Sequence, residues 1–393
     1  MTMIKIDHYF DPAAWQKFTT VAEGRETPFL IVDLNRIKFK FNEMVGLFPE
    51  AKIHYAMKAS PAVEVIKLLA ELGSNFDCAS IYELDRVLDC GVDSSRISYG
   101  NTIKKAQHVK YAYDKGVRLY ATDSEADLKN IAEQAPGSNI FVRILVEGSD
   151  TAEWPLSRKF GCHPDMAVDL LIQARELGLV PYGVSFHVGS QQKAVSVWND
   201  ALIMVKHIFD ELLTEQGIKL QMINLGGGFP AKYLNQVNPI QDYAIAVKQY
   251  LVDSYGVEDM PEIILEPGRS LAASSGVLVS DVVLISRKAQ DEATRWVYTD
   301  VGLFQGLIET LGEAIKYPVY TPKMETSTTA GTVVLAGPTC DSADIMYEKA
   351  GYQLPEELAI GDKIYWLATG AYTNSYSSVE FNGFPPLEVI YID

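Results

Sequence analysis

The sequence predicts an α/β fold in which a (β/α)₈ barrel is joined to a second domain of mostly antiparallel β-sheet. Two observations indicate this fold. From about residue 29 to 269, short apolar, β-branched runs alternate with helical patterns, which is typical of parallel βαβ units. After about residue 270, short β-rich segments follow one another between Gly, Pro and Asp turns. The chain has 393 residues, and at about 150 residues per domain this length favours two or three domains.

The first region contains nine strand candidates, one more than an eight-stranded barrel needs. We therefore assign the first candidate to the other domain and begin the barrel at Ile53. The nine candidates are Phe29–Leu34, Ile53–Lys58, Asn75–Ser80, Ile97–Gly100, Arg118–Asp123, Ile140–Val146, Tyr182–Gly189, Met222–Gly227 and Ile263–Gly268.

Helices are predicted between these strands. The first carries Ile37, Phe41, Val45 and Phe48 at a spacing that predicts one apolar face. Eight βα units over roughly 230 residues match the usual size of a (β/α)₈ barrel. We expect the barrel domain to span residues 35–269.

The second domain is expected to be a sandwich-like or barrel-like β domain made of residues 1–34 and 270–393. It takes in the N-terminal strand candidate and a series of later strands. These later candidates are Gly276–Ile285, Arg295–Thr299, Thr332–Leu335, Lys363–Leu367 and Leu387–Tyr391.

Composition and charge exclude several classes of function. Apolar residues make up 48% and charged residues 22% of the chain, and the formal net charge is −17. With no Lys/Arg run, this acidic balance argues against nucleic acid or an anionic membrane as a partner. The sequence has no long apolar span and no secretory signal pattern, so a cytoplasmic protein is expected. The four cysteines lack metal-ligand spacing, and no metal is expected.

Polar residues follow the predicted barrel strands at their C-terminal ends, where barrel enzymes carry their active sites. Lys58 ends the first barrel strand, where it is a candidate catalytic residue. The alternative is a snorkelling or salt-bridged lysine. Three glycines, Gly226, Gly227 and Gly228, follow another strand. Their backbone N–H groups are suited to an anion such as phosphate, whereas the alternative is a tight strand-to-helix turn.

Two further strands end in groups of the same kind. Glu266 and Arg269 follow the eighth barrel strand. They could bind a ligand through a carboxylate and a guanidinium, and the alternative is a structural ion pair. His187 and Ser190 lie at the end of Tyr182–Gly189, where the alternative is a buried structural histidine. Taken together, a lysine for a Schiff base, a phosphate cradle and a carboxylate for a pyridinium nitrogen match the needs of pyridoxal 5'-phosphate.

The motifs resemble those of a known family, the fold-type III, alanine-racemase-like, pyridoxal-phosphate-dependent decarboxylases of basic amino acids. Within that family the ornithine and lysine decarboxylases are the most similar. The motifs stand in the family's order and extend to about residue 384; they are HYAMKAS, FDCAS, SFHVGSQ, LGGGFP, EPGRS, GPTCDSAD and GAYTNSY followed by FNGF. The resemblance implies decarboxylation of L-ornithine, L-lysine or both to putrescine or cadaverine, in polyamine biosynthesis.

The resemblance also implies roles for individual residues of the barrel domain. Lys58 would form the Schiff base with the cofactor, Glu266 would keep the pyridine nitrogen protonated, and His187 would stack on the ring. The related racemases instead place an arginine opposite that nitrogen. The cofactor and its phosphate would be held by Ser190, Gly226, Gly227, Gly228, Gly268, Arg269 and Tyr372, while Asp77, Glu83 and Arg143 would line the site.

Three residues of the β domain would complete the site. In a homodimer, Cys340 and Asp341 would enter the active site of the partner subunit. There Cys340 would protonate the product carbanion and Asp341 would pair with the distal ammonium of the substrate. Tyr372 would contact substrate as well as phosphate.

One segment departs from the animal ornithine enzymes. They carry a second substrate-binding Asp where this chain reads TDVGLFQGLIETLGEAIKYP, and Glu313 is the counterpart we assign. Lysine and ornithine therefore both remain open as substrates. The alternatives are an arginine, diaminopimelate or carboxynorspermidine decarboxylase, an amino acid racemase, or a non-catalytic relative that only binds. A further alternative is a pyridoxal-phosphate carrier module, but such modules resemble the barrel alone, and the β domain argues against it.

Overall fold

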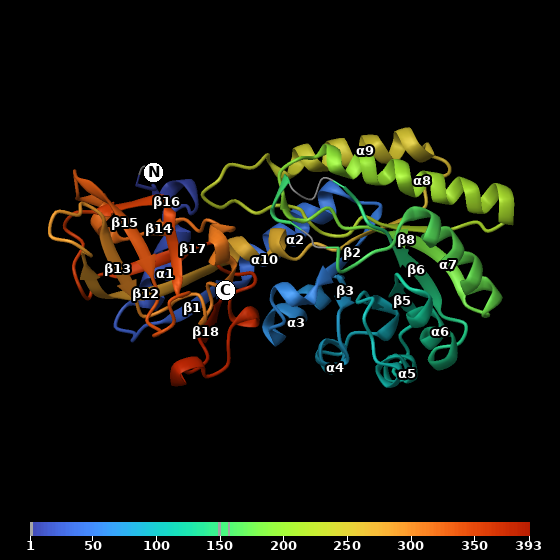
Figure 1. Ribbon diagram of the computed structural model, residues 1–393, viewed down its shortest axis with the longest axis horizontal. Helices are drawn as coiled ribbons and strands as arrows, with labels where there is room; N and C mark the ends of the chain where they lie inside the picture. The colour runs from blue at the N-terminus through green and yellow to red at the C-terminus, as the bar shows by residue number, and fades with distance from the viewer. Residues whose placement is uncertain (1–2, 148–150, 156–157) are drawn as a thin grey trace. The chain divides into compact units, whose positions relative to one another are not determined.

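The computed structural model describes residues 3–147, 151–155 and 158–393, and they form two compact units (Figure 1). The barrel unit comprises Lys38–Pro230 and Val237–Leu271. The β unit comprises Met1–Ile37, Ala231–Gln236 and Ala272–Asp393.

The barrel unit is built on eight parallel strands that close into a barrel. Each strand pairs in parallel with the next, and β11 pairs with β2 to close the ring. The (β/α)₈ prediction and the choice of the first barrel strand are therefore confirmed. The strands, in ring order, are β2 (Ala51–Ala56), β3 (Asn75–Cys78), β4 (Ile97–Tyr99), β5 (Leu119–Thr122), β6 (Asn139–Arg143), β8 (Val180–Ser185), β10 (Met222–Asn224) and β11 (Glu262–Leu265).

One helix, α2, precedes the first barrel strand, and the others connect the barrel strands and lie around them in Figure 1. They are α2 (Leu34–Leu47), α3 (Val63–Glu71), α4 (Ile81–Asp89), α5 (Ala106–Asp114), α6 (Glu125–Gln134), α7 (Pro164–Glu176), α8 (Ser196–Gln216) and α9 (Ile240–Tyr255). Serine hydroxyls cap two of these helices, because Ser80 accepts from the N–H of Glu83 and Ser124 from that of Asp127.

The apolar face of α2 differs from the prediction at one position. Ile37 and Phe41 are buried as expected, and so is Phe48 just beyond the helix. Val45, however, is 41% exposed, and Met44 is buried in its place. At about 100° per residue, a position seven residues after Ile37 returns to the same face, whereas one eight residues after it has turned past that face.

The predicted strands extend too far at their C-terminal ends. The strand expected to end at Lys58 ends at Ala56, and Lys58 lies in the 3₁₀ turn Met57–Ala59. The strand expected to reach Gly189 ends at Ser185. Phe186 and Val188 stay buried after that strand ends, so the apolar pattern continues into loops that make no strand pairing.

The β unit holds an eight-stranded sheet that is mostly antiparallel. The expected N-terminal strand, β1, belongs to it and pairs antiparallel with β12 and parallel with β18. A second parallel pair joins β13 and β15. The strands are β1 (Phe29–Asp33), β12 (Gly276–Ser286), β13 (Arg295–Thr299), β14 (Val319–Tyr320), β15 (Ala330–Ala336), β16 (Ile345–Pro355), β17 (Lys363–Leu367) and β18 (Glu388–Ile392).

One α-helix and two strands of this unit were not predicted: α1 (Pro12–Ala22) and the strands β14 and β16. The strand β16 reads IMYEKAGYQLP, so a charged pair and Gly351, which has φ +69°, interrupt its apolar alternation. The helix α1 packs aromatic rings in the core, where Trp15 meets Tyr320 and Tyr365 edge to face with centroids 5.3 and 5.1 Å apart.

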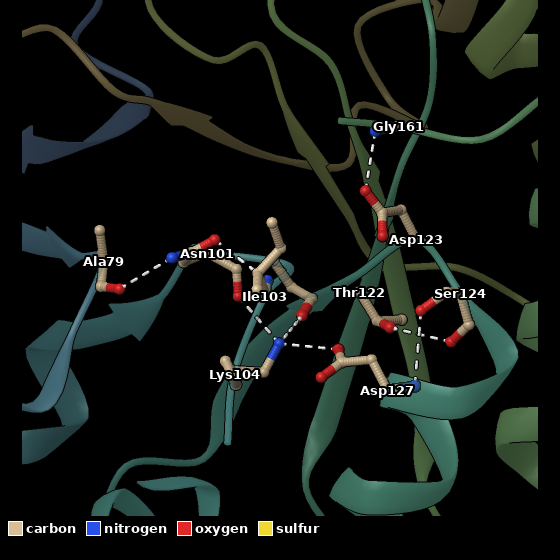
Figure 2. A network of polar contacts seen from close by, with 10 residues as sticks. Ala79, Asn101, Ile103, Lys104, Thr122, Asp123, Ser124, Asp127 and Gly161 are labelled. Carbon is tan, nitrogen blue, oxygen red and sulfur yellow. Dashed lines mark hydrogen bonds and ion pairs between the residues drawn. The ribbon is translucent and has the colours of Figure 1, made fainter. Parts of the chain in front are cut away.

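A buried ion pair links the loop after β4 to the first turn of α6, which follows β5 (Figure 2). Lys104 Nζ donates to Asp127 Oδ2 at 2.7 Å and to the carbonyls of Asn101 and Ala121 at 2.8 and 2.7 Å. The Lys104 side chain has no exposed surface. Burial lowers the pKa of Lys104 and raises that of Asp127, while their mutual attraction opposes both shifts. Each partner offsets the cost of burying the other, so removing one of them would leave an unpaired buried charge.

We expect Lys104→Met to lower the free energy of unfolding by roughly 3–5 kcal/mol, because Asp127 would remain buried without its cation. Urea denaturation measures the effect. The matched control is Lys110→Met on α5, whose ion pair with Asp114 is exposed, and it should cost less than about 0.5 kcal/mol. Adding Asp127→Leu to Lys104→Met should recover stability. Equal small losses for both lysine variants would contradict this account.

Candidate active site

Five charged or titratable side chains from different strands gather at the C-terminal end of the barrel. Asp77 lies on β3 and Arg143 ends β6, while Lys58, His187 and Glu266 follow β2, β8 and β11. Asp77 interacts electrostatically with Glu266, Lys58 and Arg143, and His187 interacts with Arg143 and Lys58. The carboxyl ends of parallel strands meet at one end of a barrel, and this is why separate motifs converge.

Asp77 is a buried carboxyl group in this cluster. Burial raises its pKa well above the usual range, and Glu266 raises it further, while Lys58 and Arg143 oppose the shift. Within the described residues, its Oδ1 has no hydrogen-bond partner. Gly100 on the neighbouring loop makes room for it, because a Cβ at that position would overlap Oδ1. The site thus presents a buried oxygen that a bound molecule could satisfy.

Glu83 lies next to this cluster. It makes a structural hydrogen bond and also interacts electrostatically with Lys58. Its Oε2 accepts the N–H of Ala79 at 2.7 Å, just before α4. Burial raises the pKa of Glu83, while this hydrogen bond and Lys58 lower it. Part of its role is therefore to hold the end of β3 against the first turn of α4.

His187 is held as a neutral ring. Its Nδ1 accepts the N–H of Gly189 at 3.0 Å, so the ring proton lies on Nε2. Burial lowers its pKa well below the ordinary value, and Arg143 and Lys58 lower it further. A neutral imidazole in this place offers a flat face rather than a cation.

The triple glycine lies near the start of the long loop between β10 and α9. Gly226 and Gly228 have φ of +64° and +101°, which favours glycine. A Cβ on Gly227 would lie 2.7 Å from the Glu266 carbonyl, and one on Gly228 would lie 2.6 Å from the Gly189 carbonyl. Only glycines therefore permit this close approach of backbones.

Arg269 and Ser190 form the polar part beside this loop. Arg269 begins the short helix α10 (Arg269–Ala272), and Ser190 begins β9 (Ser190–Gln192), which pairs with β7 (Ala152–Trp154). The guanidinium is buried and donates from Nε and Nη2 to Ser190 Oγ at 3.1 and 3.0 Å. Gly268 packs against the Lys58 turn, since a Cβ there would lie 2.9 Å from that of Ala59.

Asn224 is a site residue that sequence reasoning missed. It ends β10 and is buried, and its Nδ2 donates to Glu266 Oε1 at 2.5 Å. Its Oδ1 accepts the N–H of Gly226 at 2.9 Å. The sequence feature that could have identified it is a polar residue at the end of a buried strand, shortly before three glycines. The same pattern is typical of an ordinary turn.

Cys340 and Asp341 lie in the β unit, on the loop that follows β15. Both are exposed in the single chain. Asn382 Oδ1 accepts from the backbone N–H of Cys340 at 3.0 Å and from its thiol at 3.4 Å. Asp341 Oδ1 accepts the N–H of Ala343 at 2.8 Å.

Asp344, which the sequence analysis also missed, organises this loop from inside. Its carboxylate accepts from the backbone and hydroxyl of Thr339 at 3.0 and 2.7 Å and from the N–H of Leu303 at 2.7 Å. A Cβ on Gly302 or Gly337 would overlap it. A buried acid with three donors thus gives the loop a defined shape.

The other two predicted residues of the β unit have distinct settings. Tyr372 has φ +56°, a left-handed conformation that is unusual for a bulky residue. Glu313 Oε1 accepts the N–H groups of Glu348 and Lys349 at 2.8 and 2.5 Å. Glu313 therefore anchors the backbone of β16.

The barrel end fits pyridoxal phosphate. The glycine loop, Ser190 and the buried Arg269 offer donors suited to a phosphate. Lys58 supplies an amine, Glu266 supplies a carboxylate for a pyridine nitrogen, and Asp77 has an unsatisfied oxygen. Among the residues that the structure describes, no group of three His, Cys, Asp or Glu side chains could hold a metal ion. In the same part of the chain, no helix has the length and apolar character needed to cross a membrane.

Comparisons with known proteins agree with this geometry. Residues 34–273 match the family described as pyridoxal-dependent decarboxylase, pyridoxal binding domain. A lysine/ornithine decarboxylase of Selenomonas ruminantium is 33% identical over 93% of this chain and 89% of its own length. The ornithine decarboxylase of Saccharomyces cerevisiae is 34% identical over 95% of this chain and 83% of its own.

Solved structures show the same similarity. The lysine/ornithine decarboxylase of Vibrio vulnificus, solved as a complex with putrescine, is 26% identical and matches with a TM-score of 0.86 over 98% of this chain and 99% of its own. The family match spans the barrel, and the relatives span almost the whole chain. The chain therefore belongs to the fold-type III pyridoxal-phosphate-dependent decarboxylases of basic amino acids, which are carboxy-lyases.

Proposed function

We propose that this protein decarboxylates L-ornithine and L-lysine to putrescine and cadaverine, as a step of polyamine biosynthesis. The observation that carries the proposal is that a carboxylate, Glu266, shares the barrel end with Lys58 and a buried acid. A carboxylate opposite a pyridine nitrogen favours its protonated form, and this suits loss of carbon dioxide better than racemisation. Relatives named for lysine and ornithine support the substrate class.

The chemistry that pyridoxal phosphate supplies when bound is an electron sink for the pair released as carbon dioxide leaves. Lys58 would hold the cofactor through its side-chain amine. Glu266 would keep the ring nitrogen protonated, and His187, whose pKa is lowered by burial, would offer its flat face to the ring. Arg269, Ser190 and the N–H groups of Gly227 and Gly228 would hold the phosphate, because the N–H of Gly226 already donates to Asn224 Oδ1.

The β domain supplies the groups that act on the substrate. In this proposal residues 35–269 form the cofactor domain, and residues 1–34 and 270–393 form a domain that contributes Cys340 and Asp341 to the partner subunit of a homodimer. Cys340 donates the proton to Cα, and Asp341 pairs with the distal ammonium. Tyr372 contacts phosphate and substrate. Glu313 already holds the β16 backbone, so its effect on the substrate would depend on that anchor.

Steady-state kinetics with L-lysine, L-ornithine, L-arginine and meso-diaminopimelate test the proposal. We expect release of carbon dioxide and formation of cadaverine and putrescine from the first two substrates. Turnover of arginine or diaminopimelate alone would move the protein to another branch of the family. Binding of cofactor with no turnover of any of the four would contradict the proposed activity.

Asp341→Ala should raise KM for both lysine and ornithine, because the distal ammonium loses its charge partner. Truncating one member of a charged hydrogen-bonded pair typically costs roughly 2–5 kcal/mol. Kinetics with both substrates measure the change, and Asp291→Ala, at an exposed position of the same unit, serves as the control. Unchanged KM values with weaker cofactor binding would assign Asp341 to the cofactor instead.

A mixed-dimer experiment tests whether the site is shared. Lys58→Ala and Cys340→Ala should each be nearly inactive in forming diamine. After equal mixing and subunit exchange, about half of the dimers are mixed, and each has one intact site by two-fold symmetry. Roughly a quarter of wild-type activity should therefore return. If exchange is demonstrated and no activity returns, Lys58 and Cys340 do not act from different chains.

A further inference from the structure

Three hydrogen bonds form a closed circuit between the end of β10 and the start of the loop after β11. Asn224 Nδ2 donates to Glu266 Oε1 at 2.5 Å, and the N–H of Glu266 donates to the Gly226 carbonyl at 2.9 Å. The N–H of Gly226 donates to Asn224 Oδ1, also at 2.9 Å. The circuit links the carboxylate to the glycine loop through a single side chain.

The chemistry of the circuit determines how the amide lies. A backbone N–H can only donate, so the atom that faces Gly226 must be the oxygen Oδ1. The amide nitrogen then faces Glu266 and donates to it. Asn224 is 1% exposed, and its backbone carbonyl accepts the N–H of Phe186 at 3.1 Å. Both ends of this residue are therefore held in place.

The glycine at the other corner cannot be replaced without breaking the circuit. Gly226 has φ +64°, and a Cβ there would overlap the Phe186 carbonyl. The N–H of Gly226 is thus directed at Asn224 by a conformation that favours glycine. A change at Asn224 would release both the carboxylate and the first residue of the loop.

We propose that Asn224 is a positioning residue that orients the Glu266 carboxylate and ties it to the glycine loop that binds phosphate. This inference rests on the proposed function, in which Glu266 partners the ring nitrogen and the loop binds the phosphate. A donated hydrogen bond stabilises the charged form of a carboxylate. An amide does not titrate, so the donor is present at every pH.

The variant Asn224→Asp separates the contact with Gly226 from the contact with Glu266. The new carboxylate still accepts from Gly226, but it has no proton to give Glu266 unless the two acids share one. At the acid end of the range the shared proton replaces the amide donor. As the pH rises that proton is lost, and two carboxylates about 2.5 Å apart repel each other.

Other charged groups lie around the contact between Asn224 and Glu266. Asp77 comes from β3, Arg143 from β6, and Lys58 and His187 from the loops after β2 and β8. Glu83 on α4 also interacts with Asp77. All of these are present in wild type and variant alike, so the difference between the two pH profiles reports the change at Asn224.

The experiment uses holoenzyme reconstituted with ¹⁵N-labelled pyridoxal phosphate. The ¹⁵N shift of the ring nitrogen, its affinity for the apoprotein and kcat are measured from pH 6 to 9 for wild type and Asn224→Asp. We expect near-wild-type values at the acid end, with cofactor affinity within about twofold because the Gly226 contact is kept. Toward pH 9 the nitrogen should lose protonation and kcat should fall about tenfold or more relative to wild type. Profiles that run parallel at every pH would overturn the inference.

Asn224→Ala gives an independent result should the first variant fail to fold. It removes both contacts. Loss of the contact to Gly226 should lower cofactor affinity about 3–10-fold, the worth of one hydrogen bond, and loss of the contact to Glu266 should reduce ring protonation at every pH. Unchanged affinity and ¹⁵N shift in this variant would contradict the inference. Glu266→Gln is measured alongside: if it leaves the ¹⁵N shift unchanged, the proposed role of Glu266 fails rather than that of Asn224.

Discussion

Lys58→Ala should abolish covalent attachment of the cofactor and reduce turnover by roughly 10³-fold or more, the scale that follows removal of a covalent-catalysis nucleophile. The amine of Lys58 follows the first barrel strand and lies near the acids Asp77 and Glu83. Without it, the cofactor would be held through phosphate and ring contacts alone. The visible absorbance of the bound cofactor and the rate of diamine release measure the two effects.

The matched control is Lys52→Ala. Lys52 lies on the same strand, β2, but forms an ion pair with Glu262 at 2.7 Å and has a side chain that is 56% exposed. Its loss should leave the spectrum and turnover close to wild type, because exposed ion pairs contribute little. If Lys58→Ala keeps both properties, another lysine carries the cofactor and the site assignment is wrong.

Glu266→Ala should lower kcat by about 10²–10³-fold, a typical result of removing one preorganised electrostatic contact. Asn224 donates to the carboxylate, and the backbone N–H of Glu266 donates to the Gly226 carbonyl. Its loss removes the partner of the ring nitrogen, so the ring draws electrons less strongly. Kinetics with the better of the two substrates and the unfolding midpoint of the holoenzyme separate catalysis from stability.

Glu262→Ala provides the comparison for this variant. Glu262 begins the same strand, β11, and its ion pair with Lys52 is solvent-accessible. Turnover should stay near wild type. Near-normal turnover in Glu266→Ala, with a lower unfolding midpoint, would instead indicate that Glu266 is a structural residue.

The barrel could be predicted because its strands are short apolar runs separated by helical periods. The ends of those strands could not, because Phe186, Val188 and Leu225 are buried in loops as deeply as in a strand. Apolar pattern reports burial, whereas a strand ends where its backbone pairing ends. The strand β16 was missed for the opposite reason, since charges and Gly351 interrupt its pattern.

The barrel part of the site was predictable because parallel strands bring their carboxyl ends together. Polar residues at several strand ends therefore pointed to one place. The supporting residues were not predictable in this way. Asn224 and Asp344 are buried polar groups whose partners are distant in sequence or are backbone atoms, and neither kind of contact leaves a periodic signal.

The most direct test of the central claim is to reduce the holoenzyme with borohydride and locate the added mass by peptide mass spectrometry. Borohydride fixes the cofactor to whichever lysine holds it. The account predicts the pyridoxyl phosphate mass on the peptide that contains Lys58 and on no other lysine peptide. Labelling of a different lysine, or no labelling of a protein that binds the cofactor and releases diamine, would contradict the account.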